Sequence, residues 1–539
     1  MFGSKETYKH NDMLVKTFGC AVQGVDAIPI TIEVNLCQGM QYLIVGLPDN
    51  AVKESLPRVE SAIKNSDYKM PRSRIVFNLA PADLKKTGSS FDLAMALGVL
   101  AASEQIPDAE QLSQFMIMGE LGLDGAVQPV KGALPMAILA RKEGFKGVIV
   151  PEQNAKEAGM VNKIPVYGVK NLKEVVDFFS GIKTLNEVSV NAREEFFSGQ
   201  FDFDLDFADV KGQENIKRAL EIAAAGGHNA ILIGPPGSGK TMLAKRLPTI
   251  LPPLTLQEAL ETTKIYSVAG KLPDFNNSLL NKRPFRAPHH TISNMALVGG
   301  GGIPQPGEIS LAHNGVLFLD ELPEFSRHVL EVMRQPMEDR KVLIARAMRT
   351  IEFPSNFILL ASMNPCPCGY YNHPEKECSC SGSSVQKYLS KISGPLMDRI
   401  DLHVEVRPLP LAQMNDQQPA EKSATIRQRV IKAREIQANR FKGTEGLYTN
   451  AQMSSSQLKE YCMIDKNCEL LLLNAMQRLQ LSARAYDRIL KMARTIADLA
   501  ASDDIEIDHL TEAIQYRSLD KEQWQVTDKN MYKTKLKIA

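Results

Sequence analysis

"NAILIGPPGSGKTMLAKRL", residues 229–247, decides the fold of this chain. An apolar run leads into a glycine-rich loop, and the residues after the loop have the spacing of a helix. Glycines let backbone N–H groups wrap phosphate oxygens, and the N-terminal end of the following helix adds positive potential. The stretch therefore predicts an α/β domain with a phosphate-binding loop (P-loop), whose residues are Gly234, Pro235, Pro236, Gly237, Ser238, Gly239, Lys240 and Thr241.

A pair of acids follows a second apolar run, "GVLFLDELPEF". Lys240 offers a point charge to the β- and γ-phosphates, and the Thr241 hydroxyl is a ligand for Mg²⁺. Asp320 is expected to complete the Mg²⁺ shell with Thr241, and Glu321 to polarise the attacking water. The alternative, two ordinary acids at the end of a strand, is weakened by the P-loop. The chain is thus predicted to bind ATP and Mg²⁺ and to hydrolyse the nucleotide.

Further polar residues suit phosphoryl chemistry. A third apolar run, "FILLASMN", ends in Asn364, whose side-chain amide can orient the water; the alternative is a turn residue before Pro365. Arg399 lies between two acids in "SGPLMDRIDLH", and Arg484 and Arg488 are four residues apart on a predicted helix. Arginine suits the charge that builds on a transferred phosphoryl group. The alternative for these arginines is solvated surface pairs.

Length and composition set the broad class. The chain has 539 residues, 44% of them hydrophobic and 23% charged, and a net charge of +1. These values are typical of several soluble globular domains and exclude disordered, fibrous and globally basic nucleic-acid-binding classes. No run approaches the roughly 18 to 20 apolar residues of a membrane helix, and no signal-peptide core is seen, so we expect a cytoplasmic protein without a membrane partner.

The apolar patterns divide the chain into three blocks. Short strand-like runs at 28–34, 42–45, 75–79 and 147–150 alternate with helical stretches at 52–65 and 91–102, which predicts an N-terminal α+β domain. Strand-like runs at 230–233, 316–319 and 357–362 predict a buried parallel sheet. The predicted organisation is 1–182 α+β domain, 183–209 linker, 210–410 α/β core, 411–420 linker, 421–525 helical domain and 526–539 tail.

Four of the eight cysteines crowd into one polar segment. Their C-x-C-x₉-C-x-C spacing suits a tetrahedral structural Zn²⁺ site, with His373 as a substitute ligand. The intervening "GYYNHPEKE" has too little apolar surface to order itself, so a metal would act as its core. The alternatives are a redox pair and plain thiols. The predicted ligands are Cys366, Cys368, Cys378 and Cys380.

Taken together, "DVKGQE", the P-loop, "LFLDE", "SMNP" and "PLMDRID" resemble an AAA+ ATPase with a helical lid. More narrowly, "RPFRAPHHTISNMALVGGGGIPQPGEISLAHNGVLFLDELPEF" resembles the magnesium-chelatase-like branch, in particular the YifB/ComM family. The resemblance implies a homo-hexameric ring and pore-facing insertions between Arg286 and Glu308; the alternative for His289 and His290 there is a packing role. The roles it implies are an adenine pocket from Val210 through Gly212 to Gln213, sensor 1 at Asn364, sensor 2 at Arg488 with Arg484 as the alternative, and a finger at Arg399 that reaches the neighbouring subunit.

The N-terminal block resembles a Lon-protease-like domain, of the ribosomal S5 domain 2-like fold. Ser90, in "APADLKKTGSSFDLAMALGVLAAS", falls at the position of the protease serine, but Leu134 stands where the lysine is needed. Leucine has no proton acceptor to activate a serine. We therefore expect no proteolysis, a scaffold or a docking platform for a partner protein, and Ser90 as a helix cap.

The resemblance implies a DNA motor, a branch-migration helicase that aids integration of incoming DNA in natural transformation. Its DNA would be branched or single-stranded. Residues 422–442 form a basic amphipathic pattern that suits DNA, but also an ordinary solvated or subunit-contacting face. The alternative function is a protein or metallocofactor remodeller, similar to the magnesium chelatase motor subunit, without DNA binding.

Overall fold

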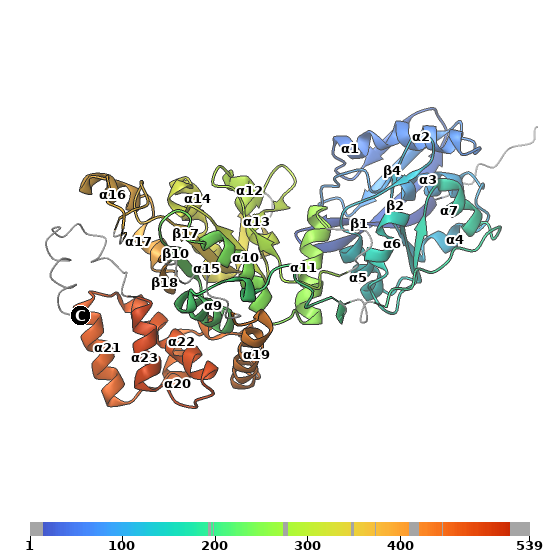
Figure 1. Cartoon of the computed structure of the whole chain (residues 1–539). Coiled ribbons are helices and arrows are strands. Elements are labelled where there is room, and N and C mark those ends of the chain that lie inside the picture. The colour runs from blue at the N-terminus through green and yellow to red at the C-terminus, as the bar shows by residue number, and fades with distance from the viewer. Residues whose placement is uncertain are drawn as a thin grey trace, which may run out of the picture. The chain divides into compact units, whose positions relative to one another are not determined.

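The chain forms two compact units in a computed structural model (Figure 1). The structure describes residues 14–191, 196–197, 199–272, 279–345, 350–371, 373, 375–408, 420–444 and 446–517. The predicted linker after the core, apart from residue 420, the end of the predicted helical domain from residue 518 and the predicted tail lie outside these residues. Unit 1 comprises Met1–Gly199, Leu256–Leu280 and Gly302–Gln305, and unit 2 comprises the intervening and remaining residues.

Within the described residues, unit 1 has a seven-stranded mixed sheet of order β3-β4-β2-β1-β5-β8-β9. The long strands β1 and β2 are antiparallel, as are β2 and β4, whereas the other neighbours are parallel. The strands are β1 Leu14–Gln23, β2 Asp26–Cys37, β3 Tyr42–Val45, β4 Arg74–Ala80, β5 Phe115–Ile117, β8 Gly147–Pro151 and β9 Val166–Val169, with a small pair β6 Glu120–Leu121 and β7 Val127–Gln128. The helices are α1 Asn50–Lys53, α2 Ser55–Asn65, α3 Asp92–Ala102, α4 Ala109–Leu112, α5 Ala133–Glu143, α6 Glu152–Ala158, α7 Leu172–Phe179 and α11 Leu256–Ala269.

Helix α3 is the centre of unit 1, and every residue along it is buried. A Cβ at Gly98 would lie 2.5 Å from Val34, so the absence of a side chain lets α3 pack directly on β2. The Thr17 hydroxyl of β1 donates to the Ala94 carbonyl at 3.1 Å. The predicted strands and helices of this block are confirmed as β2, β3, β4, β8, α1 with α2, and α3.

Unit 2 is built on a parallel sheet, five-stranded in the described part of the chain, with the order β11-β14-β17-β10-β18. Its strands are β10 Ala230–Ile233, β11 Phe285–Arg286, β14 Val316–Leu319, β17 Ile358–Met363 and β18 Leu402–Glu405. Because the strands are parallel, their carboxyl ends share one edge, where ligands of such sheets usually bind. Strand β17 lies between the strand that precedes the P-loop and the strand that precedes the acid pair.

The other elements of unit 2 are mostly helical. They are η1 Phe207–Asp209, α9 Glu214–Gly226, α10 Lys240–Ile250, α12 Asn294–Val298, α13 Glu308–Leu311, η2 Leu322–Glu324, α14 Arg327–Val332, α15 Arg334–Asp339, α16 Gly382–Leu389, α17 Gly394–Met397, α19 Ser423–Arg440, η3 Asn450–Gln452, α20 Ser455–Tyr461, α21 Lys466–Arg478, α22 Ala483–Leu499 and α23 Ile507–Gln515. Strands β15 Lys341–Ala345 and β16 Thr350–Pro354 are an antiparallel pair, and β12 Gly299–Gly300 is two residues long. The two-residue strand β13 Gln305–Pro306 lies at the boundary, with Gln305 in unit 1 and Pro306 in unit 2.

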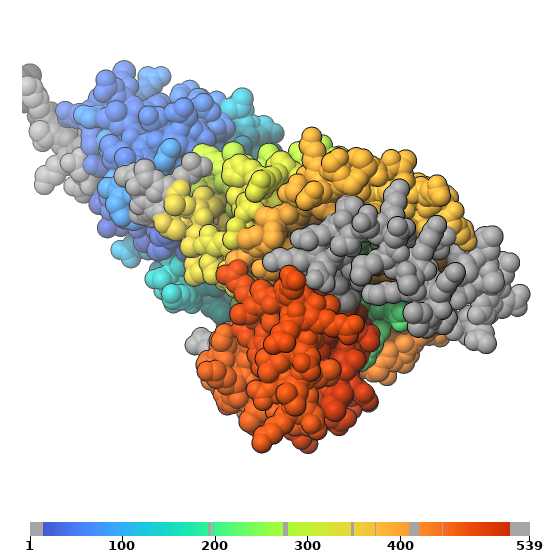
Figure 2. All heavy atoms as spheres, turned by 90° about the vertical axis from the view of Figure 1, so that its left-hand side faces the viewer, coloured from blue at the N-terminus to red at the C-terminus, as the bar shows by residue number. Residues whose placement is uncertain are grey.

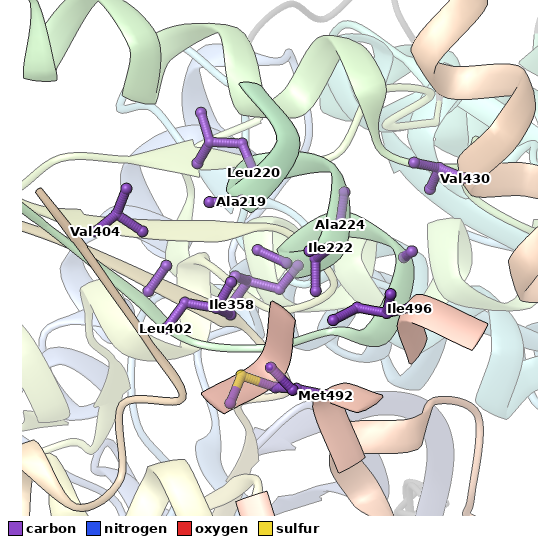
Figure 3. Packing of buried hydrophobic residues seen from close by; sticks show 14 of the residues in the cluster. Ala219, Leu220, Ile222, Ala224, Ile358, Leu402, Val404, Val430, Met492 and Ile496 are labelled. Carbon is purple, nitrogen blue, oxygen red and sulfur yellow. The ribbon is translucent and has the colours of Figure 1, made fainter. Parts of the chain in front are cut away.

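The C-terminal helices share a hydrophobic core with the sheet. Ile222 of α9, Val430 of α19 and Ile496 of α22 belong to the same buried cluster as Ile358 and Leu402 of the sheet (Figure 3). On the face shown in Figure 2, residues of the last helices gather as one rounded lobe. Truncating one buried Leu or Ile side chain to Ala lowers the free energy of unfolding by about 2–5 kcal/mol. Because the helices and the sheet share many such side chains, the helices are an integral part of unit 2. No helix in the described ranges has the length and apolarity needed to cross a bilayer.

The histidine of β18 is a pH-sensitive element of this core. His403 is 2% exposed, and burial lowers its pKa to about 3, with the Arg517 guanidinium acting in the same direction. A histidine in an unfolded chain has a pKa near 6.5. The unfolded state therefore takes up a proton first as the pH falls, and the stability that neutral His403 contributes above about pH 6.5 is lost progressively towards pH 3.

We predict that the urea midpoint of unit 2 falls between pH 7 and pH 5, and that His403→Leu makes this fall shallower. The midpoint is followed by circular dichroism on the full chain. His328→Gln, at an exposed histidine of α14, is the matched control and is expected to keep the pH dependence of the wild type. Equal slopes for wild type and His403→Leu would contradict this role of His403.

Candidate nucleotide site and cysteine cluster

The P-loop has a backbone that requires glycine. It joins the end of β10 to the first residue of α10, so the predicted order of strand, loop and helix is confirmed. Gly237 and Gly239 have φ of 78° and 87°, in the left-handed region that favours glycine. A Cβ on Gly234 would lie 2.2 Å from the Val406 carbonyl oxygen, so a side chain there would push β18 away.

The structure brings Lys240 and Asn364 together. The Lys240 amine donates to the carbonyls of Gly234 and Pro235 at 2.8 and 2.9 Å and to the Asn364 side-chain oxygen at 3.2 Å. Burial lowers the pKa of Lys240, whereas the charges of Asp320 and Glu321 oppose this effect. Asn364 directly follows β17, so the polar end of that strand lies against the P-loop amine.

The two residues predicted to hold Mg²⁺ are in direct contact. Thr241 Oγ1 donates to one carboxylate oxygen of Asp320 at 2.8 Å, and the Ser362 hydroxyl donates to the other. Carboxylate and hydroxyl oxygens are hard ligands that suit Mg²⁺. Ser362 is a site residue that the sequence analysis missed; its signal was a lone hydroxyl inside the apolar run of β17.

Glu321 faces solvent beside a histidine. Its backbone φ is 54°, an uncommon conformation for a residue with a side chain, and its side chain is 58% exposed. His290 Nδ1 lies 3.8 Å from Glu321 Oε2, and the rings of His289 and His290 have centroids 4.1 Å apart. The proximity of His290 to Glu321 was not predicted from the sequence. Arg286 and Glu308, at the two ends of the predicted insertion, form a two-point ion pair at 2.6 and 2.8 Å.

The turn that is predicted to form the adenine pocket lies at the same end of the parallel strands as the P-loop. Val210 is 1% exposed, and Gly212 and Gln213 have positive φ. The Gln213 side chain donates to the Arg407 carbonyl at 2.9 Å, just beyond the carboxyl end of β18. The turn is therefore held beside the strand that flanks the P-loop.

Arg399 and Arg488 lie near the amino-terminal end of β18, at the opposite end of the parallel strands from the P-loop. Asp401 precedes Leu402, which pairs with Ala230, whereas the P-loop follows Ile233 at the other end of β10. The Arg399 side chain is 7% exposed; it bonds Glu338 at 2.6 Å and the Pro395 carbonyl at 2.7 Å. The Arg488 guanidinium pairs with Asp401. The structure thus brings neither Arg399 nor Arg488 to the P-loop of its own chain.

Arg488 takes part in a buried ion pair. The Asp401 side chain is 3% exposed, and His228 Nδ1 lies 3.5 Å from it. Burial opposes ionisation of Asp401, but the charges and hydrogen bonds of Arg488 and His228 outweigh it and hold the pKa of Asp401 well below its ordinary value. Arg484, four residues earlier, is exposed and lines an open pocket of about 420 Å³ together with Leu473, Met476, Ala483, Tyr486 and Asp487.

The four cysteines converge as a metal site requires. Their Sγ atoms all lie within 4.8 Å of one another, and the sulfur of Cys366 is 3.3 Å from that of Cys368 and 3.7 Å from that of Cys378. Four thiolates 2.3 Å from a zinc ion would be about 3.8 Å apart. Burial opposes ionisation of Cys368, but hydrogen bonds from the Tyr370 backbone and neighbouring groups lower its pKa to about 6. The cluster thus has the donor set and the spacing for a tetrahedral thiolate site.

In unit 1, the helix-cap role of Ser90 is wrong. The N-cap residue of α3 is Phe91, so Ser90 lies one residue before the cap position, and no side chain caps that helix. The Ser90 carbonyl accepts from Gly119 N–H at 3.0 Å. Leu134 is fully buried on α5, and its N–H donates to Glu157 at 3.0 Å.

The basic helix α19 packs within unit 2 through its apolar face and its arginines, whereas Lys422, at its N-cap, and Lys432 are exposed. Its predicted apolar residues Ile426, Val430 and Ala433 are buried. Its arginines make contacts within unit 2: Arg427 lies over Phe201 at 4.5 Å, Arg429 bonds Glu221 and Glu421, Arg434 bonds the Ala224 carbonyl, and Arg440 bonds Asp498.

We predict that Arg488→Ala lowers the free energy of unfolding of unit 2 by about 3–5 kcal/mol, because it leaves the buried Asp401 carboxylate without its main partner. Arg484→Ala on the same helix is the control, with an expected change within about 0.5 kcal/mol. Urea denaturation of the full chain measures both. Equal stability of the two variants would show that the ion pair is not structural.

Comparison with known proteins gives three matching family models. The model described as "Magnesium chelatase, subunit ChlI" matches residues 206–414, "Subunit ChlI of Mg-chelatase" matches 32–154, and "Magnesium chelatase, subunit ChlI C-terminal" matches 420–517. Together they extend over both units.

Similar proteins match nearly the whole length. "Competence protein ComM" of Haemophilus influenzae is 45% identical over 508 residues, 94% of this chain and 98% of that protein. A protein named YifB of Salmonella typhimurium is 45% identical over 506 residues, 93% of this chain and 96% of its own. "Lon protease 2" of Bacillus subtilis shares a shorter stretch, 35% identical over 155 residues and 26% of each chain. The chain therefore belongs to the YifB/ComM family of magnesium-chelatase-like proteins.

Proposed function

We propose that the chain is an AAA+ ATPase that hydrolyses ATP with Mg²⁺ and works on DNA as a homo-hexameric ring. One observation carries the ATPase: at a single sheet edge, the P-loop amine of Lys240 bonds Asn364 while Thr241 bonds Asp320. Side chains from the P-loop and two neighbouring strands thus converge where a triphosphate and its metal would lie. The family models and the predicted Gly-rich motif support the same chemistry.

Each residue has a distinct role in this proposal. Thr241 and Asp320 hold Mg²⁺, which when bound neutralises charge on the β- and γ-phosphates. Lys240 exchanges its bonds to the loop carbonyls for bonds to phosphate oxygens. Glu321 polarises the attacking water and Asn364 orients it.

The arginine finger acts between subunits in this proposal. Arg399 lies away from the P-loop of its own chain, which is consistent with an action at the site of a neighbour. Glu338, its partner, is 49% exposed, and an ion pair with one exposed member can exchange at modest cost. ATP hydrolysis would then require assembly. For sensor 2, the structural ion pair of Arg488 favours the alternative, the exposed Arg484.

The DNA substrate rests on relatives and on one insertion. A relative of nearly the same length is named a competence protein, which supports a role in natural transformation. The branch-migration helicase activity is the part that the family resemblance implies. Strands β15 and β16 are inserted between β14 and β17, and the sequence that connects them, residues 346–349, is RAMR. Two arginines in four residues suit contact with DNA phosphates.

A second candidate is a remodeller of proteins or metallocofactors, which the magnesium chelatase models favour. In either case unit 1 would dock a partner protein. The buried Leu134 at the position that a protease lysine would occupy supports a non-proteolytic role.

We predict that Glu321→Gln binds ATP but lowers hydrolysis by about 10²–10⁴-fold, the usual contribution of a general base. Trapped with ATP, this variant is expected to form rings that shift a four-way DNA junction in a gel. Glu324→Gln is the matched control, because Glu324 is an acid three residues away that pairs with Lys391 at 3.3 Å. Well-formed rings that leave the junction unshifted, with turnover stimulated by unfolded protein alone, would favour the remodeller.

The cysteine cluster holds structural zinc in this proposal, with Cys366, Cys368, Cys378 and Cys380 as ligands. We predict about one zinc per purified chain by atomic emission, and loss of that zinc in Cys378→Ser with Cys380→Ser. Cys37→Ser, outside the cluster, is the control and is expected to keep the metal. A metal-free protein with full activity would end the zinc assignment.

A further inference from the structure

The cysteine cluster is packed directly against the P-loop. Gly369, the residue after Cys368, is buried and has φ of +84°. A Cβ built on it would lie 2.4 Å from Cδ and 3.1 Å from Cγ of Pro236. Real Cβ atoms do not approach that closely, so the backbone of the cysteine segment and the Pro236 ring are in van der Waals contact with no space between them.

The cysteine segment is also connected to Asn364 at both ends, by sequence at its start and through α16 at its end. Cys366 follows Asn364 by two residues, and Cys380 precedes α16 by two residues. From α16, Tyr388, which is 8% exposed, comes back to the Asn364 backbone. The chain therefore leaves the nucleotide site at Asn364, passes through the cluster and comes back to Asn364.

The shape of this segment depends on the sulfur atoms. Cys366 is fully buried, whereas the residues between Cys368 and Cys378 are mostly polar. A segment with little apolar surface gains its order from the metal that its thiolates bind. We therefore expect the Gly369 backbone to be held less firmly against Pro236 when the metal is removed.

We propose that metal occupancy of the cysteine cluster sets the affinity of the P-loop for nucleotide, through the contact between Gly369 and Pro236. The inference rests on the proposed nucleotide and zinc sites and adds a coupling between them. A P-loop that is already held in shape loses less conformational freedom when it closes on phosphates, and so binds them more tightly. The coupling is reciprocal, so nucleotide also raises the affinity of the cluster for zinc.

The first test is Gly369→Ala in the full chain, titrated with a fluorescent ATP analogue and Mg²⁺. We expect a roughly tenfold loss of affinity, within the range usual for coupled sites, with one zinc per chain retained. Gly443→Ala is the matched control, because Gly443 has a similar φ of +91° but no atom within 4 Å of its added Cβ. It separates backbone strain from the contact, and its affinity is expected to equal that of the wild type. Equal affinity in Gly369→Ala and Gly443→Ala overturns the inference.

The second test guards against simple misfolding of Gly369→Ala. Adding Pro236→Ala to that variant removes the two ring carbons that the new Cβ meets, and is expected to restore affinity relative to Gly369→Ala alone. No recovery overturns the steric contact as the route of coupling.

The third test removes zinc from the wild type with a zinc-selective chelator while Mg²⁺ is kept in excess. Nucleotide affinity is expected to fall by a similar factor and to return when zinc is added back. Unchanged affinity after complete loss of zinc overturns the inference. This test measures nucleotide binding and not hydrolysis. If the affinity depends on zinc but the chain does not hydrolyse ATP, the proposed ATPase is refuted and the coupling still holds.

Discussion

The parallel pairing of β10 with β17 on one side and β18 on the other is the constraint on which the nucleotide site depends. At the start of the P-loop, Gly234 N–H donates to Met363 at 3.2 Å and Val406 N–H donates to Ile233 at 2.7 Å. Asn364 directly follows Met363, so this register fixes its reach to Lys240. A slip by one residue would turn every side chain of a strand to the other face of the sheet and separate the site residues.

Apolar runs of ordinary strand length were predictable from the sequence, whereas strands with polar inward positions were not. The predicted runs at 230–233 and 316–319 match β10 and β14 residue for residue. Strand β1 was not predicted, because Thr17 and Gly19 occupy inward positions and break the apolar alternation. Contacts with α3 and its N-cap residue contribute to their burial: Ala94 accepts the Thr17 hydroxyl, and the Phe91 ring would lie 3.3 Å from a Cβ on Gly19.

The candidate site was predictable where each residue follows a strand-like run, and not where side chains pair with partners far away in sequence. The P-loop, Asp320 and Asn364 each follow a strand-like run, so the rule that parallel strands end at one edge placed them together. The same reasoning cannot tell a free arginine from one paired across the chain. Arg429 bonds Glu221, and Arg488 bonds Asp401, each through a partner far away in sequence.

The discontinuous make-up of unit 1 has a consequence for biosynthesis. Its last segment, Gly302–Gln305, and its helix α11 are encoded after the P-loop strand, which belongs to unit 2. A ribosome must therefore release more than half of the polypeptide before the first unit can complete its contacts, and part of the second unit emerges while the first is still unfinished. Domains usually fold in the order in which they are synthesised. Here the two units are interleaved along the nascent chain, so neither can be obtained by a single cut of the gene.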